Sequence, residues 1–567
     1  MDLLIEIYSE EIPARMQRAA LTNSKTLLSV LLSEQGLTFT ESGSYIAPQR
    51  LALFAKGLPE YTSQITEERR GPRIDAPEAA ISGFLKSTGM TLVQLAKRDG
   101  YYYANIVTDG RPVESMLPDL LHDFLDKMPW PKSMRWHNPA TNDFTRSWIR
   151  PIRAITVVLN AHWEEQTISF PVKGLDLITN NKTFGHRFLK PKSIQLTGIW
   201  QYTDQLRAAN VIVDFEERRA AVWQAMSDAA SVKKLVIQED ETLLDEVTGL
   251  VDFPYAHLGT INEAFMHLPA EVLSTSMRVH QKYFTLRTKD GTIAPYFGVI
   301  TNVPAQPHNR LMLDGFERVL RARLSDASFF YETDRAILLT DLVKKLDAII
   351  FHEKLGSVGD KVRRLEAVAA DESVKRAAFL CKSDLVTHMV GEFPELQGIM
   401  GRIYATLQGE GPEVALALEE YYQPLGPSKT TPTSPASRSL ALIDKIDTLV
   451  GFLGSGIKPT GSKDPLAIRR TALGIIRLIV EAEADDVELV DWIENAIEAY
   501  KEQNIMLSHT TTDDVLAFIQ LRFNVYVRDR YAREIVDAVL DNLGENVRPT
   551  NMWEIARQIH ALEIGNS

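Results

Sequence analysis

Two clusters of basic side chains are the groups in this sequence best suited to bind an anionic partner. Residues 132–153 carry one acid, Asp143, against five basic residues, which are Lys132, Arg135, Arg146, Arg150 and Arg153. Residues 181–192 carry no acid and four basic residues, which are Lys182, Arg187, Lys190 and Lys192. Such side chains neutralise phosphates and release counterions, which makes binding salt-dependent. The sequence therefore predicts contact with a nucleic-acid backbone, and an ordinary solvated surface is the equally weighted alternative.

Sequence signatures of a catalytic centre are missing from this chain. It contains no G-x-S-x-G elbow, no H-E-x-x-H helix and, with Cys381 as its only cysteine, no C-x-x-C pair. Residues 456–463, GIKPTGSK, have the glycine spacing of a phosphate-binding loop, but Ser462 precedes Lys463. In a working loop the lysine comes first and the hydroxyl that meets Mg²⁺ follows it, so nucleotide binding is not expected here. The chain is thus predicted to have no catalytic residue of its own.

The composition is that of a globular protein with several domains. The chain has 567 residues, of which 45% are hydrophobic and 24% charged, and this length suggests roughly four domains. Its net charge of −13 argues against a generally basic nucleic-acid-binding protein, so such binding would have to use local patches. The acidic N-terminus, MDLLIEIYSEEI, is unlike a signal peptide, and no apolar run reaches the roughly 20 residues that cross a bilayer. We therefore expect a cytoplasmic protein.

The first half of the chain has the pattern of mixed α/β domains. Leu3, Ile5 and Ile7 alternate with other residues, which predicts a strand. Pro13 then opens a predicted helix that continues towards Ser33. Segments rich in β-branched and aromatic residues predict further strands at 102–108, 154–160 and 167–172.

From Asp314 onwards the pattern is helical. Asp314 and Glu317 have the spacing of a capping box that starts a helix. The residues after them place four apolar side chains on one face of this helix, which are Leu320, Leu324, Ala327 and Tyr331. Proline and hydroxyl residues at 424–437 predict an exposed loop. Asp464, as N-cap, and Pro465, as the first helical residue, predict the start of a buried helix that runs to Glu481.

These patterns predict four regions. An N-terminal α/β region at 1–195 would contain both basic clusters, and a second α/β domain would follow at 196–313. A helical domain at 314–505 would include the loop at 424–437. A helical segment at 506–567 would end the chain.

A run of motifs resembles one known family over most of the chain. Residues 382–424 contain the core EFPELQGIMG at 392–401, which is similar to a signature of the beta subunit of the bacterial two-subunit glycyl-tRNA synthetase. Further segments resemble motifs of that family in the same order, at 3–13 (LLIEIYSEEIP), 47–53 (APQRLAL), 70–72 (RGP), 134–136 (MRW), 149–152 (IRPI), 184–188 (FGHRF), 281–284 (QKYF), 315–334, 354–357 (KLGS), 360–361 (DK), 444–449 (DKIDTL) and 461–470. The resemblance covers residues 3–540 approximately.

The resemblance implies two kinds of subunit with different tasks, in a complex of two alpha and two beta chains. The alpha chain would hold glycine, ATP and Mg²⁺. This chain, which lacks the signatures of class I and class II synthetases, would hold no cofactor or metal and would bind tRNA(Gly). The candidate tRNA-binding residues are Arg135, Arg146, Arg150, Arg153, His186, Arg187, Lys190, Lys282, Arg321 and Arg323. Family members continue into a C-terminal anticodon-binding module, which we expect this chain, ending at Ser567, to lack.

The helical half resembles an HD-type domain, whose hydrolase relatives bind a metal through histidines and aspartates. Here Lys382-Ser383-Asp384 has no histidine before the aspartate, so Asp384 and Asp444 would be remnants of such a site and no metal is expected. His388 is interpreted as a hydrogen-bonded structural residue. The expected fold class is multidomain α+β, with mixed α/β domains followed by an HD-like all-helical region. A degenerate HD-type phosphohydrolase and a stand-alone RNA-binding protein remain as alternative functions.

Overall fold

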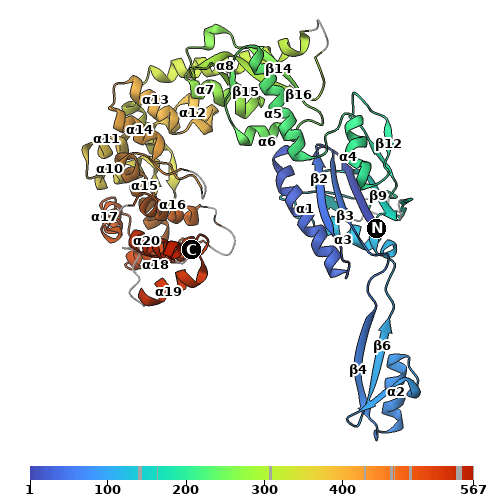
Figure 1. Cartoon of the computed structure of the whole chain (residues 1–567). Coiled ribbons are helices and arrows are strands. Elements are labelled where there is room, and N and C mark those ends of the chain that lie inside the picture. The colour runs from blue at the N-terminus through green and yellow to red at the C-terminus, as the bar shows by residue number, and fades with distance from the viewer. Residues whose placement is uncertain are drawn as a thin grey trace. The chain divides into compact units, whose positions relative to one another are not determined.

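Two compact units make up the computed structural model, which describes the chain except for residues 138–143, 162–163, 306–309, 427–429, 460–463, 465, 484–487, 544–551 and 566–567. Unit 1 consists of residues 1–260 and 281–317, and unit 2 of residues 261–280 and 318–567 (Figure 1). Sheets lie mainly in unit 1, whereas unit 2 is helical apart from one short strand pair, so the predicted α+β class is confirmed. The HD-like interpretation and the four regional boundaries stay predictions.

A five-stranded antiparallel sheet forms the centre of unit 1. Its strands, in spatial order, are β10 (Glu164–Thr167), β9 (Ile152–Ala161), β1 (Asp2–Ser9), β3 (Arg50–Lys56) and β2 (Glu41–Ala47). Two helices cover one face, α1 (Ala14–Glu34) and α3 (Leu117–Lys127), and α4 (Ile199–Ala208) covers the other. The alternation predicted for the first strand produces this arrangement, because Leu3, Ile5 and Ile7 face α1 while Leu4 faces α4.

The strand and helix predictions for this region are confirmed with one exception. The strands predicted at 154–160 and 102–108 correspond to β9 and to β6 (Tyr101–Thr108), and the helix predicted after Pro13 is α1. The strand predicted at 167–172 is wrong, since β10 ends at Thr167 and only an isolated bridge at Pro171 follows. Proline has no N–H to donate to a ladder, which explains why the strand does not continue.

A small three-stranded sheet forms a separate lobe of unit 1. Its order is β4 (Ile65–Arg73), β6 and β5 (Ala96–Arg98), and α2 (Glu78–Thr88) packs on one of its faces (Figure 1). The core between them contains Tyr102 and Ala104 from β6 and Phe84 from α2. Gly71 permits the close approach, because a Cβ atom at this position would lie 2.4 Å from the ring of Phe84.

Unit 1 also contains a four-stranded sheet. Its order is β13 (Val236–Ile237), β15 (Phe284–Arg287), β16 (Ile293–Thr301) and β14 (Tyr255–Thr260), and it packs against α5 (Phe215–Val232) and α6 (Glu241–Thr248). Two strand pairs lie elsewhere in unit 1, β7 (Met134–His137) with β8 (Phe144–Trp148) and β11 (Lys182–Phe184) with β12 (Ser193–Gln195). Short 3-10 turns occur at η1 (Leu92–Gln94) and η2 (Val113–Met116).

Unit 2 is a stack of helices. Its longer helices are α8 (Leu311–Arg335, most of which belongs to this unit), α10 (Val358–Val368), α11 (Glu372–Leu380), α13 (Ile399–Leu407), α14 (Pro412–Glu420), α15 (Pro435–Gly454), α16 (Ile468–Val480), α17 (Leu489–Glu502), α18 (Thr511–Arg528), α19 (Arg533–Leu543) and α20 (Met552–Gly565). Shorter elements are η3 (Glu263–Phe265), α7 (Ala270–Thr275), the π-helical turn η4 (Ser276–Gln281), α9 (Leu339–Val343), η5 (Lys344–Ala348), β17 (Ile350–His352), β18 (Gly356–Ser357), η6 (Ser383–Val386), α12 (His388–Glu392) and η7 (Pro394–Leu396). None of the described helices is long and apolar enough to span a bilayer.

The helix starts predicted for this half are partly wrong. Helix α8 begins at Leu311 rather than Asp314, because the Asp314 N–H already donates to Arg310 O in the first turn. The predicted stripe of Leu320, Leu324, Ala327 and Tyr331 is confirmed as the buried face. The loop predicted at 424–437 is three residues too long, since Ser434 caps α15 by accepting from the Ser437 N–H.

Asp464 caps α16 from outside the helix. Its carboxylate accepts hydrogen bonds of 2.9 Å from the N–H groups of Ile468 and Arg469. The residue at the N-cap position itself is Ala467, so the predicted position was wrong while the predicted capping is confirmed. Pro465 lies outside the described residues.

Candidate nucleic-acid interface

One end of the five-stranded sheet brings together segments that lie far apart in the sequence. The Ser9 N–H, at the end of β1, donates to Gln49 O at 2.8 Å, and the Glu10 N–H donates to Pro151 O at 3.0 Å. Residues 182–188 join them, since the Lys182 carbonyl accepts from the Thr156 hydroxyl in the middle of β9 and the Phe184 carbonyl accepts from Arg50 at the start of β3. Four of the motifs found in the sequence, at 3–13, 47–53, 149–152 and 184–188, therefore meet at one place.

A buried polar network fixes this meeting point. The Arg50 guanidinium donates to Thr183 Oγ1 at 3.1 Å and to the Phe184 carbonyl at 2.8 Å. Glu6 lies beside it, 3.4 Å from Arg50 Nη1, and accepts from the hydroxyls of Thr183 and Tyr202. Both Glu6 and Arg50 are fully buried. Because buried charges are stable only when paired and hydrogen-bonded, the network holds residues 183–184 firmly against the sheet.

His186 shapes the loop that follows. Its imidazole is fully buried, and Nδ1 accepts from the N–H groups of Phe188 and Leu189 at 3.2 and 3.1 Å. The His186 N–H donates to Ala209 O at 2.9 Å. A ring enclosed in this way organises the backbone and leaves the neighbouring side chains to face solvent.

The loop and the sheet end display basic side chains in exposed ion pairs. Arg187 lies 3.1 Å from Glu11 and stacks over the ring of Phe188, which is itself 64% exposed. Arg153 pairs with Glu10. Exposed ion pairs contribute about 0–1 kcal/mol, so a phosphate can replace either carboxylate at little cost.

Two further candidate residues lie at the same sheet end. The half-buried Arg150 donates to the Ile149 carbonyl at 3.2 Å, and Lys190 is exposed on the loop. The Lys190 N–H donates to His186 O at 2.9 Å, which closes the loop. The structure thus brings Arg150, Arg153, His186, Arg187 and Lys190 together, with four of the five side chains reaching solvent.

The remaining candidates have other neighbours. Arg146 is buried and donates to the carbonyls of Lys173 at 3.1 Å and His122 at 3.2 Å. Burial lowers the pKa of Arg146, and Asp126, 3.1 Å away, opposes this effect. The Arg146 side chain thus joins two backbone segments. In this conformation it is enclosed rather than open to a phosphate.

Arg135 lies exposed on β7, opposite Ser147 of β8. Lys282 pairs with Glu246 at 3.0 Å and Arg323 with Glu392 at 3.1 Å, whereas Arg321 is exposed on α8. None of the contacts described for these four residues links them to the loop at 184–190, so their role as RNA contacts stays a prediction.

Neither Glu6 nor Phe188 was predicted from the sequence to be part of this site. A signal for Glu6 exists, because it is the one acid inside the otherwise apolar run of β1 and must find a buried partner. For Phe188 the sequence gives only an aromatic next to an arginine, and its exposure follows from the loop geometry.

The remnants expected of an HD-type site have structural contacts in unit 2. The Asp384 carboxylate accepts from the N–H groups of Gly398 and Gly401 at 2.6 and 3.3 Å, at the start of α13. Asp444 lies 3.3 Å from Lys361 and 3.1 Å from Lys382. Although burial disfavours its charged form, these ammonium groups hold the pKa of Asp444 below its usual range.

The interpretation of His388 as a structural residue is confirmed. Its Nδ1 and Asp334 Oδ1 are 2.9 Å apart, and its N–H donates to the same oxygen at 3.0 Å. Among the described residues, no three His, Cys, Asp or Glu side chains are grouped so as to hold a metal ion.

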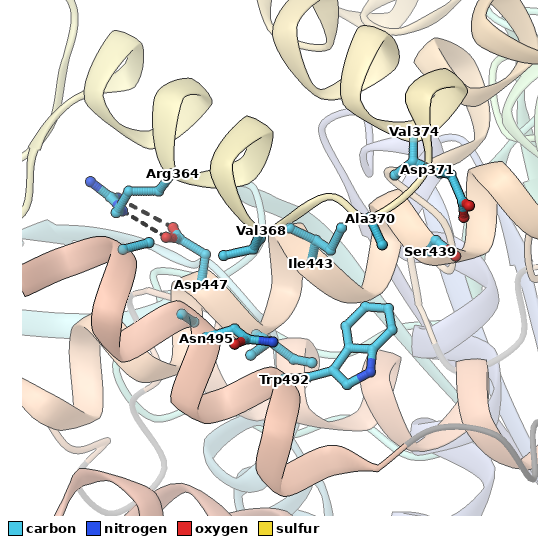
Figure 2. A pocket seen from close by; sticks show the side chains of 13 residues that line it. Arg364, Val368, Ala370, Asp371, Val374, Ser439, Ile443, Asp447, Trp492 and Asn495 are labelled. Carbon is cyan, nitrogen blue, oxygen red and sulfur yellow. Dashed lines mark hydrogen bonds and ion pairs between the residues drawn. The ribbon is translucent and has the colours of Figure 1, made fainter. Parts of the chain in front are cut away.

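A cavity of about 190 Å³ lies between α10, α11, α15 and α17 of unit 2 (Figure 2). The ion pair of Arg364 and Asp447, at 2.7 Å, forms one wall, and Trp492 lies across from Val368 and Ile443 (Figure 2). Arg364 is satisfied by Asp447 together with carbonyl, amide and hydroxyl groups around it. The wall is thus part of the packing of the unit.

The buried carboxyl of Asp384 predicts a specific pH dependence. Burial raises the pKa of Asp384 to about 6 in the folded chain, against 3.8 for the free group. Between about pH 4 and pH 6 the folded state therefore binds a proton that the unfolded state has lost, and this group's contribution to stability falls as pH rises. Asp384→Asn keeps an acceptor for Gly398 and Gly401. The free energy of unfolding of this variant, relative to the original chain, should rise by about 3 kcal/mol across that window.

Urea denaturation of both chains at several pH values measures this difference. A constant difference between the two chains would contradict the burial of an ionisable carboxyl at this position.

Comparison with known proteins gives a consistent result along most of the chain. The family model described as the glycyl-tRNA synthetase beta subunit matches residues 3–541. The glycine–tRNA ligase beta subunit of Paracoccus denitrificans (strain Pd 1222) is 41% identical over 565 residues, which cover 96% of this chain and 79% of that protein. The proteins of the same name from Rhodospirillum centenum and Ruegeria sp. are each 39% identical, over 96% and 99% of this chain and 80% and 81% of theirs.

Proposed function

This chain belongs to the family of glycyl-tRNA synthetase beta subunits, and from that premise we propose that its task within the enzyme is to bind tRNA(Gly). The resemblance inferred from the sequence motifs is thereby confirmed, and the protein is a subunit of a glycine–tRNA ligase. Such an enzyme implies an alpha-subunit partner. We propose that two alpha and two beta chains assemble in the cytoplasm, where tRNA is charged.

The convergence of four motif segments at one end of the five-stranded sheet is the observation that supports tRNA binding best. It gathers Arg150, Arg153, Arg187 and Lys190 at this sheet end, where Arg187 stacks over the exposed ring of Phe188. Flexible basic side chains of this kind contact the phosphates and position an RNA without reading its sequence. The exposed aromatic ring adds a surface on which a base can stack.

The partner would carry out the chemistry. In this proposal the alpha chain holds glycine, ATP and Mg²⁺, forms glycyl-adenylate and transfers glycine to the 3′ end of the tRNA. The beta chain holds the tRNA so that this end stays in the partner's site. Orientation of this kind lowers a barrier without any bond being made by the residues responsible.

Removing two of the arginines tests the interface. Arg150→Ala combined with Arg187→Ala should weaken the binding of tRNA(Gly) about tenfold at moderate salt, because two phosphate contacts are lost. The slope of log K against log salt concentration should become shallower by about 1.5. Adenylate formation by the complex with the alpha subunit should not change. Fluorescence anisotropy with labelled tRNA and ATP–pyrophosphate exchange measure the two quantities.

A matched control is Arg528→Ala, which removes an arginine of similar exposure from an ion pair with Asp537 in unit 2. It should leave the salt slope as it is. If the double variant lost adenylate formation and tRNA binding to the same extent, the two arginines would be holding the fold rather than the RNA.

A further inference from the structure

The three-stranded lobe of unit 1 has one covered and one open face. Side chains alternate along β6, so Tyr102 and Ala104 enter the core against α2. Tyr101, Tyr103, Asn105 and Val107 point to the other face, and Asn105 and Val107 are exposed there. Among the described residues, the helix that packs in the core of this lobe is α2, on the opposite side of the sheet.

Arginines lie beside the two tyrosines of the open face. The strand register places Arg70 of β4 opposite Tyr103 and Arg73 opposite Tyr101. The Arg70 guanidinium lies 3.6 Å from the centre of the Tyr101 ring, and the Arg98 guanidinium of β5 lies 4.7 Å from that of Tyr103. The face therefore presents two half-exposed aromatic rings, each with a guanidinium over it.

The charge of the lobe differs from that of the chain. Residues 61–112 contain seven basic and six acidic residues, in a chain whose net charge is −13. On the open face, Arg98 pairs with Glu68 and Arg73 pairs with Asp75 at 3.0 Å. Arg70 is exposed and has no carboxylate partner among the described residues, and its guanidinium lies over the ring of Tyr101. The open face is thus complementary to a ligand that carries both negative charge and flat aromatic rings.

We propose that this open face binds unpaired nucleotides of the tRNA by stacking bases on Tyr101 and Tyr103. Aromatic side chains on a sheet surface, two residues apart on one strand, are about 7 Å from each other, and such rings hold successive bases of a single strand. Arg70 neutralises the adjacent phosphate. This inference rests on the proposed function, since it adds a second RNA contact to the same subunit.

A base-paired RNA is a poorer ligand for the same surface. In an A-form helix the bases are stacked on one another and their faces are not available to a protein. The open face is therefore expected to distinguish unpaired from paired RNA. The basic side chains at the end of the five-stranded sheet contact phosphates, which both kinds of RNA carry, and need not make this distinction.

Two sets of substitutions in the full chain separate stacking from packing. Tyr101→Leu with Tyr103→Leu removes both aromatic rings but keeps apolar bulk, while Tyr101→Phe with Tyr103→Phe keeps the rings. Binding of a fluorescein-labelled 12-nucleotide oligocytidylate should weaken about tenfold for each ring removed, and should stay within about twofold for the phenylalanine pair. Arg70→Gln should weaken it about threefold and reduce its salt dependence. A 12-base-pair RNA duplex should bind the original chain and the leucine pair alike.

Control measurements establish that the lobe remains folded. Val93→Ala, at a 95% exposed position in the same lobe, should change nothing. Circular dichroism should give the leucine pair and the original chain the same spectrum. Should the leucine pair unfold the lobe, Arg70→Gln still decides the question, because it removes no apolar side chain and should weaken binding of the oligocytidylate.

Unchanged binding of the oligocytidylate by the leucine pair, or no binding by the original chain, would overturn the inference. So would loss of association with the alpha subunit while RNA binding persisted, because the face would then be a protein-docking surface. The proposed function fails separately, if the original chain does not bind tRNA(Gly) or if Arg150→Ala with Arg187→Ala has no effect on that binding.

Discussion

Replacement of Asp447 by alanine is expected to lower the free energy of unfolding of unit 2 by about 3–5 kcal/mol. Asp447 is 2% exposed and accepts from Arg364 at 2.7 Å and from Lys361 at 2.9 Å. The Tyr500 hydroxyl lies 3.3 Å from the same carboxylate. Without the Asp447 carboxylate, the guanidinium of Arg364 and the ammonium group of Lys361 remain buried with one carboxylate fewer. Uncompensated buried charge costs far more free energy than the loss of a single contact.

Urea denaturation combined with hydrogen exchange at α10 and α15 measures this loss. The matched control is Asp537→Ala, which removes an aspartate from an ion pair with Arg528 at a partly exposed site. Exposed pairs contribute about 0–1 kcal/mol, so the control should stay below 1 kcal/mol. A loss for Asp447→Ala as small as that of the control would show that the buried cluster does not hold the helices together.

Arg50→Ala is expected to weaken tRNA binding by tenfold or more, although Arg50 is buried and touches no RNA. The substitution leaves Glu6 buried without its counter-ion, at a cost of about 3 kcal/mol or more. It also frees Thr183 and the Phe184 carbonyl, which the guanidinium now holds. The loop carrying Arg187 and Lys190 would then lose its fixed position at the sheet end.

A second variant distinguishes the loss of the loop's position from a general loss of stability. Adding Glu6→Gln to Arg50→Ala removes the unpaired charge, so part of the free energy of unfolding should return while tRNA binding stays weak. Anisotropy measurements of tRNA(Gly) binding and urea denaturation of both variants report these two quantities. Full recovery of tRNA binding in the double variant would mean that the loop does not depend on Arg50.

Local patterns in the sequence predicted much of the fold. The alternation of Leu3, Ile5 and Ile7 and the proline after them define β1 and α1, because each pattern involves only neighbouring residues. The stripe along α8 was predictable for the same reason. Where a boundary depends on one hydrogen bond, as at Asp314, the pattern gave a position one turn too late.

The candidate interface was predictable only in part. Charge alone gathered Arg146 with Arg150 and Arg153, but net charge carries no information about burial, and Arg146 is enclosed. The contact of Arg50 with Thr183 joins residues 133 positions apart, which no periodicity in the sequence reports. The tyrosines of β6 were read as strand formers, and only the placement of α2 shows which of them face solvent.

The measurement that tests the central claim most directly is glycine attachment to tRNA(Gly) by the alpha subunit with and without this chain. The account predicts that the alpha subunit alone forms glycyl-adenylate but transfers little glycine to tRNA. Addition of this chain should restore transfer, and the variant with Arg150→Ala and Arg187→Ala should restore it only at low salt. Equal transfer by the alpha subunit alone, or adenylate formation by this chain alone, would contradict the account.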